Sequence, residues 1–145
     1  MPNHASILPK ELSELSAESD HVLVCKVEKV QMLDERGNEL RDREARTGPG
    51  LKNELRLHLV IEKDGVLKTN AEKVPDKLIP LSQAWHYSLG QWKDNSEGKV
   101  FIFLLKGADF QRVYPGLFKR QLSEKTAIDK ILREQKEKTP NNPSQ

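Results

Sequence analysis

Cysteine, aromatic residues and long apolar runs are all scarce in this sequence of 145 residues. With Cys25 as the single cysteine, an intramolecular disulfide is excluded, and no Cys-x-x-Cys or His-x-x-x-His spacing offers ligands for zinc. No stretch approaches the roughly 18 consecutive apolar residues of a membrane-spanning helix, and the mean hydropathy is −0.69. We therefore expect no membrane span and no metal centre.

An excess of one charge sign is also missing. The formal net charge is +2, from 24 basic and 22 acidic side chains, which does not favour nucleic acid as the partner. Residues 106–145 carry a modest basic excess, which is typical of a solvated helix; an anion-binding or nucleic-acid surface is the alternative. The apolar residues gather in a few dense runs, so a folded domain is expected rather than a disordered chain.

Motifs of known catalytic sites are absent as well. The sequence has no Gly-x-Ser-x-Gly nucleophile elbow, no Walker loop and no His-Glu-x-x-His zinc motif. Cys25 lies on the inward face of a predicted strand, where a cysteine packs as a small apolar residue. The four histidines are scattered singly along the chain, at His4, His21, His58 and His86. The sequence thus predicts a protein that is not an enzyme and uses no cofactor.

The apolar pattern predicts one domain over residues 1–138 and a disordered tail over residues 139–145. A short helix is predicted near the N-terminus, and a second helix is predicted to begin after Ser123 as its N-cap. Asp64 and Gly65 predict a turn, and Pro80 predicts an edge strand. Five strands are predicted, at residues 22–33, 53–61, 77–81, 100–105 and 110–114.

The first predicted strand carries a break in its alternation. Leu23, Cys25 and Val27 share one face, whereas Val30 and Met32 continue the apolar pattern one residue out of phase. A β-bulge near residues 28–29 would restore the phase and bend the strand sharply. Such bends help small barrels to close. Five strands with flanking helices therefore predict a mainly β, five-stranded OB-like Greek-key barrel, with an open α+β sandwich as the alternative.

The predicted barrel core draws on two strands. Residues 53–61 alternate cleanly between apolar and polar side chains, as a half-buried strand does. Residues 100–105 are apolar on both faces, which is typical of a central strand covered on both sides. The side chains expected to be most deeply buried are Leu57, Leu59, Phe101 and Phe103.

Three sequence blocks resemble bacterial members of the netrin/TIMP-like OB family. They are SDHVLVCKV at residues 19–27, LVIEKDGVLK at residues 59–68 and EGKVFIFL at residues 97–104. The resemblance implies the same barrel and implies an exported, protein-binding domain. Cys25 replaces the glycine usual in the first block. The N-terminal cysteine and the disulfides of the metalloprotease inhibitors are also missing, so inhibition by that mechanism is not implied.

The most unusual segment is residues 83–92, which holds both tryptophans and one of the two tyrosines. Aromatic residues with polar atoms are enriched at the centres of protein interfaces. The candidate partner-binding residues here are Trp85, His86, Tyr87 and Trp92. Two alternatives stay open: the rings fill the end of the barrel, or they stack on single-stranded bases as in nucleic-acid-binding OB folds.

A long polar loop at residues 34–52 offers a second candidate surface, with Arg41, Arg43 and Arg46 as binding residues. We therefore expect a non-enzymatic protein-binding module, such as an exported inhibitor or an immunity protein that neutralises a toxin or enzyme. A single-stranded nucleic-acid-binding protein is the alternative. The first residues lack a signal peptide. A mature periplasmic or secreted chain is expected, with a cytoplasmic location as the alternative.

Overall fold

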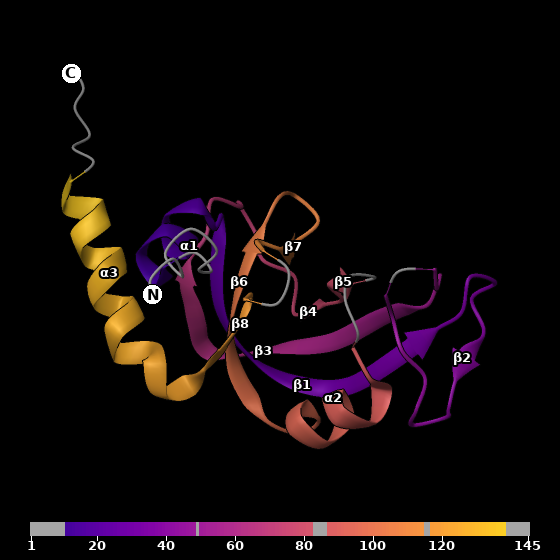
Figure 1. Cartoon of the computed structure of the whole chain (residues 1–145). Coiled ribbons are helices and arrows are strands. Elements are labelled where there is room, and N and C mark those ends of the chain that lie inside the picture. Colours follow the sequence, from indigo (N-terminus) through magenta and orange to yellow (C-terminus); the bar gives the residue numbers. More distant parts are fainter. Residues whose placement is uncertain (1–10, 49, 83–86, 115–116, 139–145) are drawn as a thin grey trace, which may run out of the picture.

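The computed structural model describes residues 11–48, 50–82, 87–114 and 117–138, and the fold is mainly β. Its strands pair in one antiparallel sheet, and three α-helices pack around it (Figure 1). The helices are α1 (Leu12–Glu18), α2 (Leu89–Ser96) and α3 (Lys125–Lys138). The strands are β1 (His21–Leu33), β2 (Glu39–Leu40), β3 (Glu54–Lys68), β4 (Lys77–Leu78), β5 (Leu81–Ser82), β6 (Val100–Lys106), β7 (Gln111–Arg112) and β8 (Lys119–Gln121).

Strand β1 lies at the centre of this sheet. It pairs with β3 on one side and with β6 on the other, and β2 pairs with its far end. Both β4 and β5 pair with β3, whereas β7 and β8 pair with β6. A fourth strand that returns to lie beside the first, as β6 does beside β1, is the order of a Greek key.

The sheet does not close among the described residues, so a five-stranded OB-like barrel is not confirmed. The outer strands β4, β5 and β7 contain two residues each, and β8 contains three. Strands this short offer few backbone groups for pairing across the gap between the two edges. The coarser prediction, a mainly β domain with helices at both ends of the described chain, is confirmed.

The predicted bulge in the first strand is present. Val27 pairs with Leu59 on β3, but Lys29 pairs with His58, so one residue of β1 is inserted between them. Side chains alternate with a period of two, so this insertion turns the second half of the strand over. Val30 is fully buried as a result, although it is out of phase with Val27.

The predicted turn at Asp64 and Gly65 is wrong. Strand β3 continues through both residues. Its pairing with β1 is irregular there, because Cys25 pairs with Ile61 whereas Leu23 pairs with Val66. Asp64 has a φ of 59°, a conformation that turns and bulges share. At Gly65 a Cβ atom would lie 2.6 Å from the carbonyl oxygen of Val24, so a side chain would push the two strands apart.

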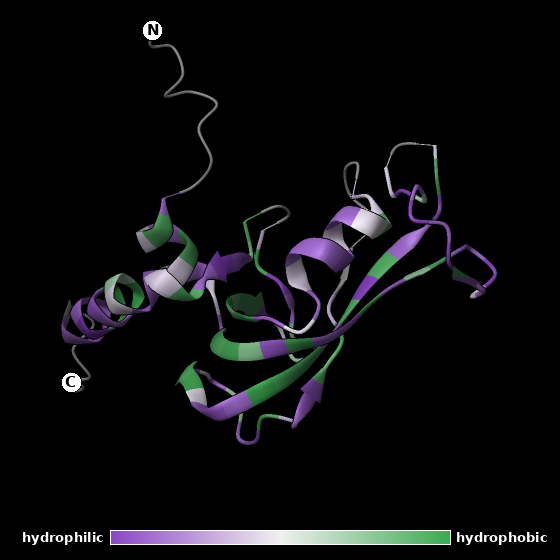
Figure 2. Ribbon diagram, turned by 90° about the horizontal axis from the view of Figure 1, so that it is seen from below, coloured by the Kyte–Doolittle hydropathy of each residue, from purple (hydrophilic) through white to green (hydrophobic). Residues whose placement is uncertain are grey.

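Apolar side chains cover both faces of β6, as predicted for a central strand. Phe101 and Phe103 belong to the main core with β1 and β3, whereas Ile102 and Leu104 face a second cluster with Leu15 of α1 and Ile128 of α3. Figures 1 and 2 show the helices α1 and α3 side by side at one end of the sheet. The four predicted core residues Leu57, Leu59, Phe101 and Phe103 are each at most 4% exposed.

The C-terminal part differs in detail from the prediction. Ser123 lies within a 3₁₀ turn (Leu122–Glu124), and α3 begins at Lys125. The predicted fifth strand shortens to β7, and the polar strand β8 was not predicted because it carries no apolar alternation. The predicted tail, residues 139–145, lies outside the described residues. Within the described part of the chain, no helix is long and apolar enough to cross a membrane.

Leu57 provides a test of the strand register. Leu57→Ala is expected to lower the free energy of unfolding by about 2–5 kcal/mol, because the side chain is 1% exposed and its removal leaves a cavity. Urea unfolding followed by circular dichroism measures this. The control is Ile79→Ala, since that side chain is 44% exposed. Equal midpoints for Leu57→Ala and the wild type would contradict the register.

Candidate partner-binding surface

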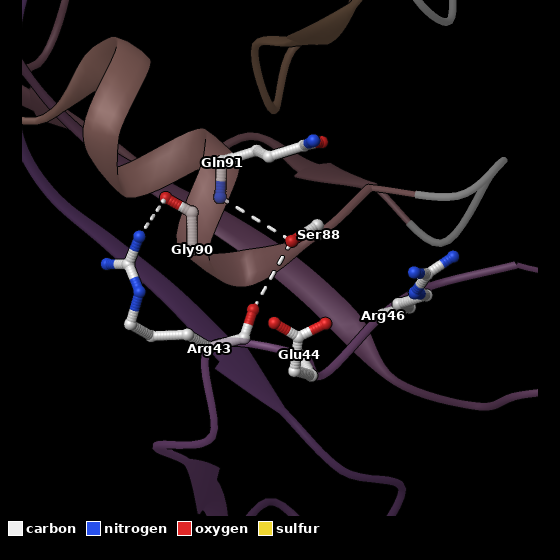
Figure 3. A pocket seen from close by; sticks show the side chains of 6 residues that line it. All are labelled: Arg43, Glu44, Arg46, Ser88, Gly90 and Gln91. Carbon is white, nitrogen blue, oxygen red and sulfur yellow. Dashed lines mark hydrogen bonds between the residues drawn. The ribbon is translucent and has the colours of Figure 1, made fainter.

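The structure joins the two predicted surfaces into one. The amide of Leu89 donates to the carbonyl of Ala45 at 2.9 Å, and the amide of Gly90 donates to the carbonyl of Arg43 at 3.0 Å. These amides belong to the first turn of α2, where a helix has backbone donors without partners inside the helix. The loop carrying the arginines therefore satisfies the start of α2 and lies directly against it (Figure 3).

Local sequence explains why α2 begins there. Ser88 is the N-cap: its hydroxyl accepts from the Gln91 amide at 3.5 Å and donates to the carbonyl of Arg43 at 3.3 Å. Gly90 has no side chain, and a Cβ at that position would lie 3.0 Å from the Cβ of Arg43. A serine followed by a glycine two positions later thus lets the loop approach the helix closely.

The other end of α2 is fastened to the bulge of β1. The amide of Gly98 donates to the carbonyl of Val27 at 2.7 Å, and the Val27 amide donates to the carbonyl of Lys99 at 2.9 Å. The carboxylate of Glu97 accepts from the Val30 amide at 2.8 Å. Backbone groups on both sides of the bulge are therefore paired with the segment after α2, and the helix is held at both ends.

A polar pocket of about 230 Å³ opens where the loop meets the helix. Figure 3 shows the carboxylate of Glu44 between the side chains of the two arginines that line this pocket. The lining residues are Arg43, Glu44, Arg46, Ser88, Gly90 and Gln91.

Charge in this pocket is partly neutralised. Arg43 pairs with the carboxylate of Asp94 and donates to the carbonyl of Gly90 at 3.5 Å. The hydrogen bond and the charge of Arg43 hold the pKa of Asp94 below its ordinary value. Arg41 and Arg46 are exposed and form no ion pair within 4.0 Å among the described residues, although the charge of Arg41 helps to lower the pKa of Glu39. Their guanidinium groups are available to carboxylates on another molecule.

Trp92 fills the end of the core beneath this surface. Its ring is partly buried, lies 4.9 Å from the ring of Tyr87 and stacks on Phe118 at 6.3 Å. The ammonium of Lys119 lies 4.5 Å above the indole and 4.4 Å from the ring of Phe101. Burial lowers the pKa of Lys119, as does the charge of Lys99. This packing favours the alternative in which the aromatic residues close the end of the core.

The structure places only some of the predicted site residues together. Arg43, Arg46 and Tyr87 come together with Trp92 around α2, and Arg41 lies exposed in the same loop. Trp85 and His86 lie outside the described residues. Sequence reasoning missed Ser88 and Asp94. Ser88 carries a recognisable N-cap signal before an apolar residue, but nothing local reveals that Asp94 pairs with an arginine 51 positions earlier.

Among the described residues, no group of three or more histidine, cysteine or acidic side chains could hold a metal ion. Cys25 is fully buried in the main core, where the packing interpretation places it. Burial and the charge of Glu62 raise its pKa to about 12, so the thiol stays protonated near neutral pH. Comparisons with models of protein families, with curated proteins and with solved structures found no significant match.

Trp92→Ala tests the role of the indole in closing the core. We expect a loss of about 3–5 kcal/mol in the free energy of unfolding, because the contacts to Tyr87, Phe118 and Lys119 disappear. Urea unfolding measures the loss, with Trp92→Phe as the milder control. In a Trp85→Phe background, iodide should quench Trp92 weakly. Strong quenching with an unchanged midpoint would show an exposed anchor instead.

Cys25 should be unreactive in the folded protein. At about pH 8 an ordinary cysteine is partly thiolate and reacts with dithionitrobenzoate, whereas a buried thiol with its pKa raised to about 12 does not. The reaction is expected only after unfolding in urea. Cys25→Ala should retain the fold and cost about 1–3 kcal/mol of stability. Rapid reaction of the native protein would instead indicate an exposed, reactive thiol.

Proposed function

We propose that this chain is a non-enzymatic protein-binding module whose contact surface consists of residues 41–46 and the start of α2. One observation carries the proposal: backbone hydrogen bonds from Leu89 and Gly90 fasten the arginine-rich loop to a helix that is itself fastened to the bulge of β1. The backbone that carries the arginines therefore loses little conformational freedom when a partner binds.

The chemistry of the surface favours a partner with carboxylates. Arginine is enriched among residues that dominate protein interfaces, and its planar group forms paired hydrogen bonds with carboxylates. Arg43 is aligned by Asp94, while Arg41 and Arg46 extend from the same loop. Trp92 and Tyr87 stiffen the base of this surface by packing on the core.

The proposed biological setting follows the family resemblance. Small exported domains similar to the netrin/TIMP-like family mostly bind proteins, and we place this chain with inhibitors or toxin-neutralising immunity proteins of the periplasm or the extracellular space. The same resemblance implies that the curved sheet is a variant of the OB-like barrel. The Greek-key order of β1, β3, β4 and β6 supports that assignment.

Quantitative affinity capture tests the proposal. The wild-type chain and the double variant Arg43→Glu, Arg46→Glu are immobilised and exposed to periplasmic and secreted proteins, and captured proteins are compared by mass spectrometry. Specific partners should be depleted from the double variant, and purified partners should bind it about tenfold or more weakly in calorimetry. Thermal unfolding checks that the variant remains folded.

The matched control is Lys63→Glu, Lys130→Glu, which makes the same charge change at exposed positions away from the pocket. It should retain the partners. Capture of the same proteins by both double variants would contradict the proposed surface. Tight binding of a single-stranded oligonucleotide that weakens steeply with salt would favour a nucleic-acid-binding function instead.

A further inference from the structure

A second hollow lies away from the arginine loop, beside the two terminal helices. It is a groove of about 890 Å³ between α1, the end of β3 and α3. Figure 1 shows these helices at the end of the sheet away from β2. The lining residues are Ala17, Val66, Leu67, Lys68, Asp129, Leu132, Arg133, Gln135 and Lys136.

Apolar side chains form part of the groove surface. Val66 is 43% exposed although it is a branched residue within a strand. Leu67 and Leu132 are partly buried against the cluster beneath α1 and α3, and Ala17 of α1 is exposed beside them. Apolar atoms that line a concave surface in this way mark sites where another molecule packs.

The charged side chains at the groove are mainly basic. Arg133 and Lys136 are exposed and make no ion pair with the described part of the chain. Lys68 donates to the carbonyl of Ser16 at 3.0 Å, near the C-terminal end of α1. The acidic residue Asp129 is already paired with the ammonium of Lys125 at 2.9 Å. The groove therefore keeps a net positive charge.

The groove residues of α3 lie in one row that a partner helix could follow. Asp129, Leu132, Arg133 and Lys136 follow the spacing i, i+3, i+4 and i+7, which places them in one row along the groove. The row thus presents one apolar side chain, Leu132, followed by two basic side chains. A partner helix with the same spacing could place apolar side chains into the groove and carboxylates against the row.

The segments of this chain that could reach the groove do not have the complementary chemistry. Helix α1 is acidic, but its leucines already pack on the second core cluster. Residues 1–10 contain no acidic side chain, and residues 139–145 contain no acidic residue and no apolar residue except proline. Helix α3 of a second copy carries five basic and three acidic side chains, so it would be repelled. A segment of a different protein, both acidic and amphipathic, satisfies the apolar surface and the charges together.

We propose that the groove between α1, β3 and α3 binds an acidic amphipathic helix of a partner protein. This site is independent of the surface around residues 41–46, because the two sets of lining residues share no member.

The test uses a synthetic fluorescent peptide as the probe, with about four helical turns, leucine at i, i+3, i+4, i+7 and i+11, and glutamate on its flanks. Two control peptides replace every glutamate by lysine or every leucine by serine. Fluorescence anisotropy should show that the full-length chain binds the glutamate peptide about tenfold or more tightly than either control. Added salt should weaken the binding.

Variants locate the site. Arg133→Glu, Lys136→Glu should lower the affinity about tenfold or more, and Val66→Ser should lower it without removing a buried side chain. The matched control Lys63→Glu, Lys73→Glu makes the same charge change at exposed positions that do not line the groove, and it should leave the affinity unchanged. The variant Arg43→Glu, Arg46→Glu should also leave it unchanged, which separates this proposal from the proposed function. Backbone amide shifts in NMR spectra should concentrate at residues 66–68 and 129–136.

Several outcomes would overturn the proposal. They are failure of the glutamate peptide to bind, equal binding of the lysine peptide, or insensitivity to the changes at Arg133, Lys136 and Val66. Preferential binding of phosphatidylglycerol vesicles or of dodecanoate to the same groove would also overturn it, because the ligand would then be a lipid surface or a free amphiphile.

Discussion

The bulge in β1 between Val27 and Lys29 is the constraint on which the other features depend. Without it, the strand would direct Val30 and Met32 to the side opposite Val27 and Cys25, and the long β1–β3 ribbon would have no continuous apolar face. Backbone groups on both sides of the bulge, at Val27 and Val30, pair with the residues after α2. The C-terminal end of α2 is therefore fastened beside the irregularity in β1.

This chain of contacts extends to the candidate surface. The N-terminal end of α2 is hydrogen-bonded to the loop that carries Arg43 and Ala45, and the segment after its C-terminal end is hydrogen-bonded to β1 at the bulge. One short helix thus connects two segments that are distant in sequence. Trp92 fills the space between α2 and the core, with Lys119 above its ring. Rigidity at the surface thus derives from buried contacts, while the arginines themselves remain in solvent.

The opposite end of the molecule follows a different principle. Strand β6 is apolar on both faces, so its outer face must be covered, and α1 and α3 cover it through Leu15 and Ile128. Only the buried side of α3 contributes to that cover. The part of α3 that contains Arg133 and Lys136 borders an open groove. Covering one strand is therefore what creates the second hollow.

The sequence by itself determined the features that depend on local periodicity. The alternation from Leu55 to Ile61, the phase change that requires the bulge and the double apolar pattern of β6 are all visible because side chains in a strand alternate with a period of two. Capping is also local, and Ser88 could have been assigned on that basis. The misassigned turn at Asp64 shows the limit of prediction from local sequence, since a turn and a bulge use the same backbone conformation.

Only the tertiary structure decided which segments distant in sequence are in contact. Arg43 contacts Asp94 and Gly90 because the fold brings their two segments together. The sequence around Arg43 does not indicate these partners, and the sequence around Asp94 does not indicate Arg43. The polar strand β8 forms because β6 offers it backbone partners, not because its side chains have a strand pattern. Sheet edges, pockets and ion pairs depend on distances between remote residues, and the pattern within one segment contains no information about those distances.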